Sequence, residues 1–126
     1  MTRYATASLA LLISLAPSAA SAQDAEAGAA VFRKCIACHN VDKPANKLGP
    51  HLQGVVGRTA GSLEGYNYSQ AMKDAGAAGL VWDEASLGEY LAAPKVKVPG
   101  TKMVFPGLKD SDDLENVIAY LKSVSG

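Results

Sequence analysis

The chain is organised around Cys35-Ile36-Ala37-Cys38-His39. This stretch holds both cysteines of the 126-residue sequence, and a histidine directly follows the second one. The spacing is the attachment signature of a c-type haem. One helical turn can present both thiols to one porphyrin edge, where they form thioethers, and the histidine then lies against the iron. The motif predicts one haem c, covalently bound through Cys35 and Cys38, with His39 as an axial ligand.

A Cys-x-x-Cys pair has other uses in proteins. It can be a thioredoxin-like redox pair, half of a zinc site or a simple disulfide of an exported domain. A zinc site lacks ligands here, because the only other histidine is His51 and there is no second cysteine pair. A thioredoxin-like pair requires a strand–helix–strand pattern, which does not surround the motif. The haem interpretation is favoured and, like any motif match, is a hypothesis.

Residues 1–22 have the three parts of a Sec signal peptide. Arg3 supplies the basic start, and the apolar run from Leu9 to Leu15 is too short to span a bilayer. Ala20-Ser21-Ala22 matches an A-x-A cleavage site. We expect cleavage after Ala22, which leaves residues 23–126 as a single domain. An uncleaved anchor is the alternative.

The charge balance argues against one class of partner. The sequence has 12 basic and 12 acidic residues, and loss of Arg3 with the signal peptide changes this little. A nucleic-acid-binding domain normally carries a basic excess, so no nucleic-acid partner is expected. No other apolar run approaches the length of a bilayer span. We therefore expect a soluble protein without stable membrane insertion.

Helical patterns occupy four segments. Asp24, Asp83 and Ser111 stand at the starts of three of them as predicted N-caps. Gly28 lies inside the first segment, where it costs about 1 kcal/mol relative to alanine, so we expect a second helix to approach it closely. No segment has a clear strand pattern, so the predicted fold class is all-α. The helices are predicted over residues 24–34, 68–75, 83–92 and 111–123.

Two segments rich in glycine and proline lie between these helices, at residues 40–65 and 95–107. This composition predicts irregular structure. A loop as long as residues 40–65 is uncommon in a compact domain unless it has a functional role, such as enclosing a ligand. A haem would be such a ligand.

Spacing alone does not fix the second axial ligand. A methionine sulfur opposite His39 raises the reduction potential and suits electron transfer. Met103 follows the rigid turn of residues 98–102, whereas Met72 lies in a predicted helix and is more typical of core packing. His51 is too close in sequence to His39 to reach the far face easily, and we interpret it as a surface residue. The spacing favours Met103 and leaves core packing as its alternative.

The chain resembles a class I cytochrome c, in particular the small bacterial periplasmic cytochromes of the c2 type, over essentially all of residues 23–126. The resemblance implies that family's fold, in which several short helices and long loops wrap one covalently bound haem. It also implies the periplasm, because bacterial haem attachment is completed outside the cytoplasm. The matching residues are Gly28, Phe32, Cys35, Cys38, His39, Gly49-Pro50, Leu52, Gly57-Arg58, Trp82, Tyr90-Leu91, Pro94, Pro99-Gly100-Thr101-Lys102-Met103, Phe105 and residues 117–121.

The resemblance also implies roles for individual residues. The carbonyl of Pro50 would accept a hydrogen bond from Nδ1 of His39 and fix its orientation. Met103 would be the second axial ligand, with Tyr90 near its sulfur. Ordinary packing is the alternative for each, and Tyr90 would pack in either case. Three side chains would donate toward a haem propionate: Arg58, Tyr68 and Trp82.

The function implied by the resemblance is a soluble periplasmic one-electron carrier, and not an enzyme. It would dock transiently, as a monomer, between a membrane bc-type complex or dehydrogenase and an oxidase, reductase or photosynthetic reaction centre. An enzyme or gas sensor with an open iron position, and an acceptor dedicated to one dehydrogenase, are the alternatives. Seven lysines flank the haem segments and either steer docking or form an ordinary solvated surface: Lys34, Lys43, Lys47, Lys95, Lys97, Lys102 and Lys109.

Overall fold

The computed structural model describes residues 12–14 and 24–125. Within them the only extended pairing is an isolated antiparallel bridge between Thr59 and Val81, which confirms the all-α prediction. No helix in the described part of the chain has the length and apolarity needed to cross a membrane. The helices are α1 (Ala25–Val31), the 3-10 helix η1 (Phe32–Lys34), α2 (Gln70–Ala77), α3 (Glu84–Ala92), α4 (Pro94–Lys97) and α5 (Ser111–Val124).

The predicted signal peptide lies almost entirely outside the described residues. Its cleavage site after Ala22 is among the residues not described, so processing of the N-terminus stays a prediction.

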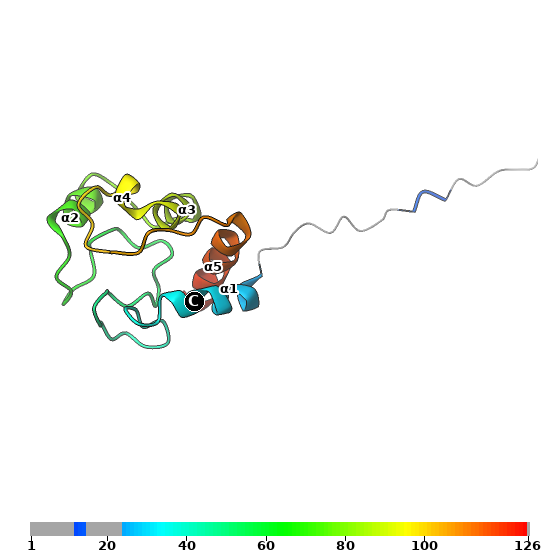
Figure 1. Ribbon diagram of the computed structural model, residues 1–126, viewed down its shortest axis with the longest axis horizontal. Coiled ribbons are helices and arrows are strands. Elements are labelled where there is room, and N and C mark those ends of the chain that lie inside the picture. The colour runs from blue at the N-terminus through cyan, green and yellow to red at the C-terminus, as the bar shows by residue number, and fades with distance from the viewer. Residues whose placement is uncertain (1–11, 15–23, 126) are drawn as a thin grey trace, which may run out of the picture.

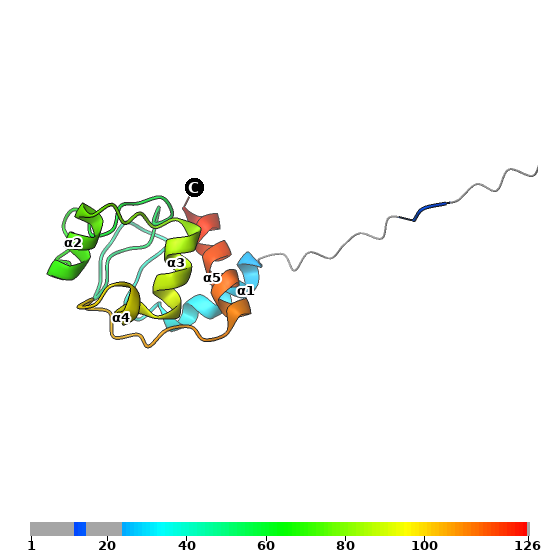
Figure 2. The same ribbon diagram turned by 90° about the horizontal axis from the view of Figure 1, so that it is seen from above.

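Helices α1 and α5 cross in close contact, side by side in both views (Figures 1 and 2). A Cβ atom at Gly28 would lie 1.9 Å from the carbonyl oxygen of Asn116. The Asn116 side chain also accepts a hydrogen bond from the backbone of Asp24, at 2.9 Å. Beside the crossing, the rings of Phe32 and Tyr120 lie 5.3 Å apart. The predicted close approach at Gly28 is confirmed, and it fixes the segment that leads into Cys35.

Helix caps follow the sequence with one correction. Asp24 and Asp83 cap α1 and α3 with side-chain oxygens, as predicted. The sequence analysis places the cap of α5 at Ser111, which is wrong. Asp110 has the extended backbone of a cap, and its carboxylate accepts from the N–H groups two and three residues on, at 2.9 and 3.1 Å. Ser111 is already the first helical residue.

Three other boundaries differ from the prediction. The first helix turns into η1 after Val31. Helix α2 is shifted two residues beyond the predicted 68–75, because Ser69 caps it by accepting from Met72 N–H. The segment after α3 is not wholly irregular, since α4 begins at Pro94. Proline suits the first helical position, where its missing N–H has no partner to lose.

The core joins the α1–α5 pair to the rest of the molecule. The loops of residues 40–69 run between this pair and α2 in both views (Figures 1 and 2). Trp82 and Tyr90 pack together with ring centroids 4.9 Å apart. Met72 is 8% exposed, in agreement with its interpretation as core. The buried core residues are Phe32, Val55, Ala60, Met72, Trp82, Leu87, Tyr90, Val98, Leu108, Val117, Ile118 and Leu121.

Gly28→Ala should destabilise the protein, because its Cβ would overlap the Asn116 carbonyl and push α1 from α5. Overpacking of this kind costs about 1–3 kcal/mol. Gly88→Ala in α3 is the control, since its Cβ would find only Ile118 Cδ1 at 3.8 Å and gains helix propensity. Urea unfolding of both variants makes the comparison. A Gly28→Ala protein as stable as the control would contradict the crossing.

Asp110→Ala should lower the free energy of unfolding by about 1 kcal/mol, the usual value of an N-cap. Ser111→Ala should leave it nearly unchanged, because Ser111 is not the cap of α5. Thermal unfolding of the two variants decides which residue caps the helix, and equal losses would refute the assignment.

Candidate cofactor site

The two cysteines lie on a tight turn that continues η1. The N–H of Cys35 donates to the Phe32 carbonyl at 2.7 Å, and those of Cys38 and His39 donate to the Cys35 carbonyl at 3.1 and 2.9 Å. Both thiols are half-buried and unbonded to each other. Burial, with a smaller effect of Cys38, raises the pKa of the Cys35 thiol. One short segment thus presents two free thiols and an imidazole together, as the motif predicts.

The His39 ring is held from two consecutive residues. Its Nδ1 lies 2.7 Å from the Pro50 carbonyl oxygen. Because a carbonyl can only accept, Nδ1 carries the proton, and in the neutral ring Nε2 keeps its lone pair. Burial lowers the pKa of His39, although the Pro50 bond opposes this. Behind the ring, a Cβ at Gly49 would lie 2.3 Å from Cε1. The expected contact with Pro50 is present, and it leaves a neutral, oriented ligand.

The loop after His39 is tied back to the cysteine turn. The N–H of Gly49 donates to the Cys38 carbonyl at 2.9 Å, and that of Leu52 donates to the Asn40 carbonyl at 2.8 Å. His51 is partly exposed, and its carbonyl accepts from Arg58 Nη2 at 3.0 Å. These bonds fix Pro50 relative to His39.

Arg58 is the centre of a second group of predicted site residues. The Trp82 N–H donates to the Arg58 carbonyl at 2.9 Å, which sets these two residues side by side. Burial raises the pKa of Tyr68, and the nearby Arg58 charge opposes the rise. Arg58 Nη1 is buried without a hydrogen-bond partner among the described residues. An unpaired buried donor is costly, so this position suits an anionic acceptor such as a haem propionate.

Met103 lies on the long loop between α4 and α5. It is half-buried and packs against the core. Its N–H donates to Thr101 Oγ1 at 3.4 Å, and the same hydroxyl hydrogen-bonds the Tyr90 hydroxyl at 2.7 Å. Burial raises the pKa of Tyr90. In Figure 1 this loop, in orange, crosses the domain from α4 to α5, and the cysteine turn, in cyan, lies below it. Tyr90 is thus hydrogen-bonded to the loop that carries Met103, and its proximity to the Met103 sulfur stays a prediction.

Two contacts of this site were not predicted from the sequence. Gly49 supports the His39 ring, and Thr101 connects Tyr90 to the Met103 loop. Both residues belong to the matching motifs quoted above. Only the family motifs point to Gly49 and Thr101, because each of them contacts a residue that is distant in sequence.

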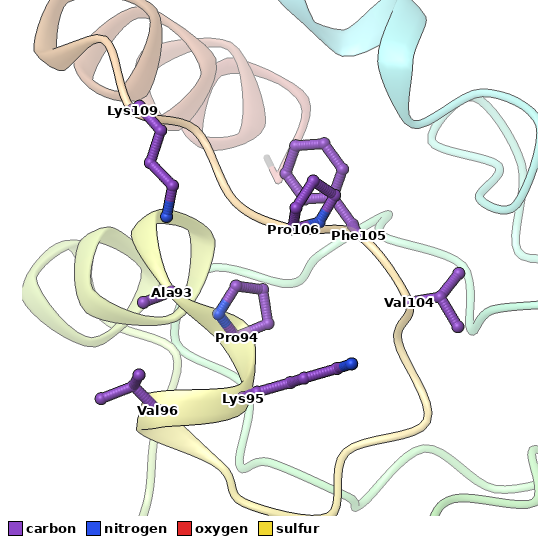
Figure 3. Close-up of a pocket in the computed structure, with 8 residues that line it drawn as sticks. All are labelled: Ala93, Pro94, Lys95, Val96, Val104, Phe105, Pro106 and Lys109. Atoms are coloured by element: carbon purple, nitrogen blue, oxygen red, sulfur yellow. The ribbon is translucent and has the colours of Figure 1, made fainter.

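A cleft of about 330 Å³ adjoins the Met103 loop (Figure 3). Its titratable side chains are two lysines, so it offers no acid–base or nucleophilic pair. Val96 and Val104 at its margin are 80% and 86% exposed. Among the residues that the structure describes, no group of three or more His, Cys, Asp or Glu could hold a metal ion. The cleft is lined by Ala93, Pro94, Lys95, Val96, Val104, Phe105, Pro106 and Lys109.

Comparisons with known proteins cover this whole region. Residues 25–125 match the Cytochrome c family. Cytochrome c2 of Agrobacterium tumefaciens (strain II Chrys) is 50% identical over 99 residues, covering 78% of this chain and 89% of that protein. Cytochrome c-550 of Nitrobacter winogradskyi is 52% identical over 99 residues, covering 78% and 88%. The solved structure of cytochrome cH from Methylobacterium extorquens aligns with a TM-score of 0.73 at 52% identity, covering 79% of this chain and 98% of that one.

Gly49→Ala should displace the His39 ring, since the added methyl would overlap Cε1. We expect weaker ligation by His39 and a loss of about 1–3 kcal/mol in unfolding free energy from overpacking. Circular dichroism in the Soret band, followed through urea unfolding of the haem-loaded protein, measures both effects. The control is Gly88→Ala, which adds the same methyl away from the site. A Gly49→Ala protein with the Soret dichroism and stability of that control would contradict the packing.

Proposed function

The chain belongs to the cytochrome c family, and on this premise we propose that it is a soluble periplasmic one-electron carrier whose haem iron is ligated by His39 and Met103. It carries one covalently bound haem c. Cys35 and Cys38, the two cysteines of the sequence, are the residues available to attach it. The observation that best supports the proposal is the neutral His39 ring, oriented by Pro50 within the motif that attaches the cofactor. No substrate is transformed.

The haem supplies a one-electron couple between ferrous and ferric iron. The chain's own residues control access to it and its potential. His39 offers the lone pair of Nε2, because Nδ1 is committed to Pro50. Met103 would be the second iron ligand, since its loop is anchored through Thr101 and Tyr90 while Met72 is buried in α2. A thioether ligand favours the reduced state and leaves no open position for a substrate.

We assign the propionate contact to Arg58, supported by Tyr68 and Trp82. The support is the buried Nη1 of Arg58, which lacks an acceptor in the described residues. A carboxylate there would form a charge-assisted hydrogen bond and offset the cost of burying both charges.

The partners we propose are a bc-type complex or a dehydrogenase as donor, and an oxidase, reductase or reaction centre as acceptor. Transient docking suits a face of exposed valines and lysines beside the Met103 loop. Lys97 is paired with Glu89, so its charge contributes little to the attraction of a docking partner. Lys102 and Lys109 donate to backbone carbonyls, which fixes their positions but keeps their charges. We therefore expect salt to slow association without abolishing it.

Met103→Ala should remove the weak methionine–iron absorption band of the ferric protein. It should also lower the midpoint potential by on the order of 0.1 V, a fraction of the ~0.8 V that axial ligands span. Met72→Leu is the control, because this volume-conserving change costs less than about 1.5 kcal/mol and should keep the band. Redox titration with optical detection tests both. A potential unchanged in Met103→Ala would sink the ligand assignment.

A further inference from the structure

Two buried side-chain nitrogens in the described part of the chain have no hydrogen-bond partner, and they belong to two residues in contact. They are Nη1 of Arg58 and Nδ1 of His51. The same guanidinium donates through Nη2 to the His51 carbonyl at 3.0 Å. Buried polar groups are normally hydrogen-bonded, so two exceptions at one place indicate a local function rather than two unrelated defects.

The backbone of His51, rather than its ring, holds the residue in place. Its N–H donates to Asn46 Oδ1 at 3.0 Å, and its carbonyl accepts from Arg58. The carbonyl of the residue before it, Pro50, is the one that orients His39. A substitution that removes only the His51 ring therefore leaves these backbone contacts in place.

The His51 ring is the titratable group of this pair near neutral pH. The sequence has two histidines, and the proposed function commits the other, His39, to the iron. Burial and the Arg58 charge both lower the pKa of His51, and the Gln53 backbone opposes them. Arg58 is the charged side chain of the described residues that acts on the ring, and no carboxylate there does. The ring is therefore neutral at neutral pH and gains a proton as the pH falls.

Arg58 connects this ring to the cofactor. We assign a haem propionate to Arg58, and the carboxylate would supply the missing partner of Nη1. The other end of the same guanidinium is bonded to the His51 backbone. Charges that are partly buried are screened less by salt and water than charges at the surface. The charge of the cofactor therefore acts on the protonation of His51.

We propose that His51 is a redox-linked proton site, which binds a proton more tightly when the iron is ferrous than when it is ferric. Reduction removes one positive charge from the iron, and this loss favours a positive charge on the His51 ring. One electron then enters at the iron while a proton from solvent enters at the imidazole, and both leave on oxidation. The inference rests on the proposed function, because it requires an iron that changes its charge.

Redox titration of the haem-loaded protein between about pH 5 and 9 tests this. The midpoint potential should rise as the pH falls through the pKa of His51, because the protonated ring favours the reduced state, and should be flat well above that pKa. A roughly fivefold difference in proton affinity between the redox states, the low end of couplings between sites, is expected. It corresponds to about 40 mV, at about 59 mV per factor of ten for one electron.

His51→Asn should remove this pH dependence, since asparagine does not titrate and the backbone contacts remain. Lys95→Ala is the control. Lys95 is an exposed lysine of α4, and its loss changes the net charge without removing a group that titrates near neutral pH. The control should displace the whole curve and keep its shape. A His51→Asn protein with the pH dependence of the wild type would overturn the proposal, because another group, such as a propionate, would then carry the proton.

A second measurement does not depend on the variant. Proton NMR of the His51 ring gives its pKa separately in the ferrous and the ferric protein. Linkage requires the two pKa values to differ by the same factor that the potential reports, with the higher value in the ferrous state. Equal pKa values in a protein that shows the methionine–iron band would overturn this inference alone. A wild type that lacks the band would instead refute the proposed function.

Discussion

The hydrogen bond between His39 Nδ1 and the Pro50 carbonyl is the constraint on which the site depends. It sets the tautomer and the plane of the ring, and burial keeps the ring neutral. Gly49 permits the contact because it has no side chain to meet the ring. The loop from Asn40 to Leu52 delivers these two residues: Gly49 N–H donates to the Cys38 carbonyl of the cysteine turn, and Leu52 N–H closes the loop on the Asn40 carbonyl. A cofactor attached at Cys35 and Cys38 would therefore meet an imidazole that is already oriented.

The helices supply the frame for this arrangement. The α1–α5 crossing fixes the start of the cysteine turn, because Gly28 lets the two backbones approach closely. Helix α3 fixes the Met103 loop, since Tyr90 and the end of that helix form hydrogen bonds with it. Helical packing thus places two loops, and the loops carry the chemistry. This division explains how short helices suffice around a large cofactor.

Local features of the fold could be predicted from the sequence. Asp24 and Asp83 cap their helices because a carboxylate directly precedes each apolar pattern. Asp110 and Ser111 are both competent caps, so pattern alone could not choose between them. Pro94 follows the helix predicted over residues 83–92, where a proline is expected to end it, but proline equally suits the first position of a helix, as it does in α4. Such errors of one turn do not move the site.

The sequence predicts the candidate ligands, which stay predictions, but not the contacts that support them. Spacing gives Cys35, Cys38 and His39, and the family pattern adds Pro50 and Met103. The hydrogen bonds of Thr101 with Tyr90 and of Lys102 with the Asn67 carbonyl join residues 11 and 35 positions apart, which periodicity does not detect. The most direct test is a proton NMR spectrum of the reduced protein with labelled methionine methyl groups. The account predicts that the Met103 methyl lies far upfield, shifted by the porphyrin ring current, while the Met72 methyl does not share that shift. A Met103 methyl in the ordinary aliphatic region would contradict it.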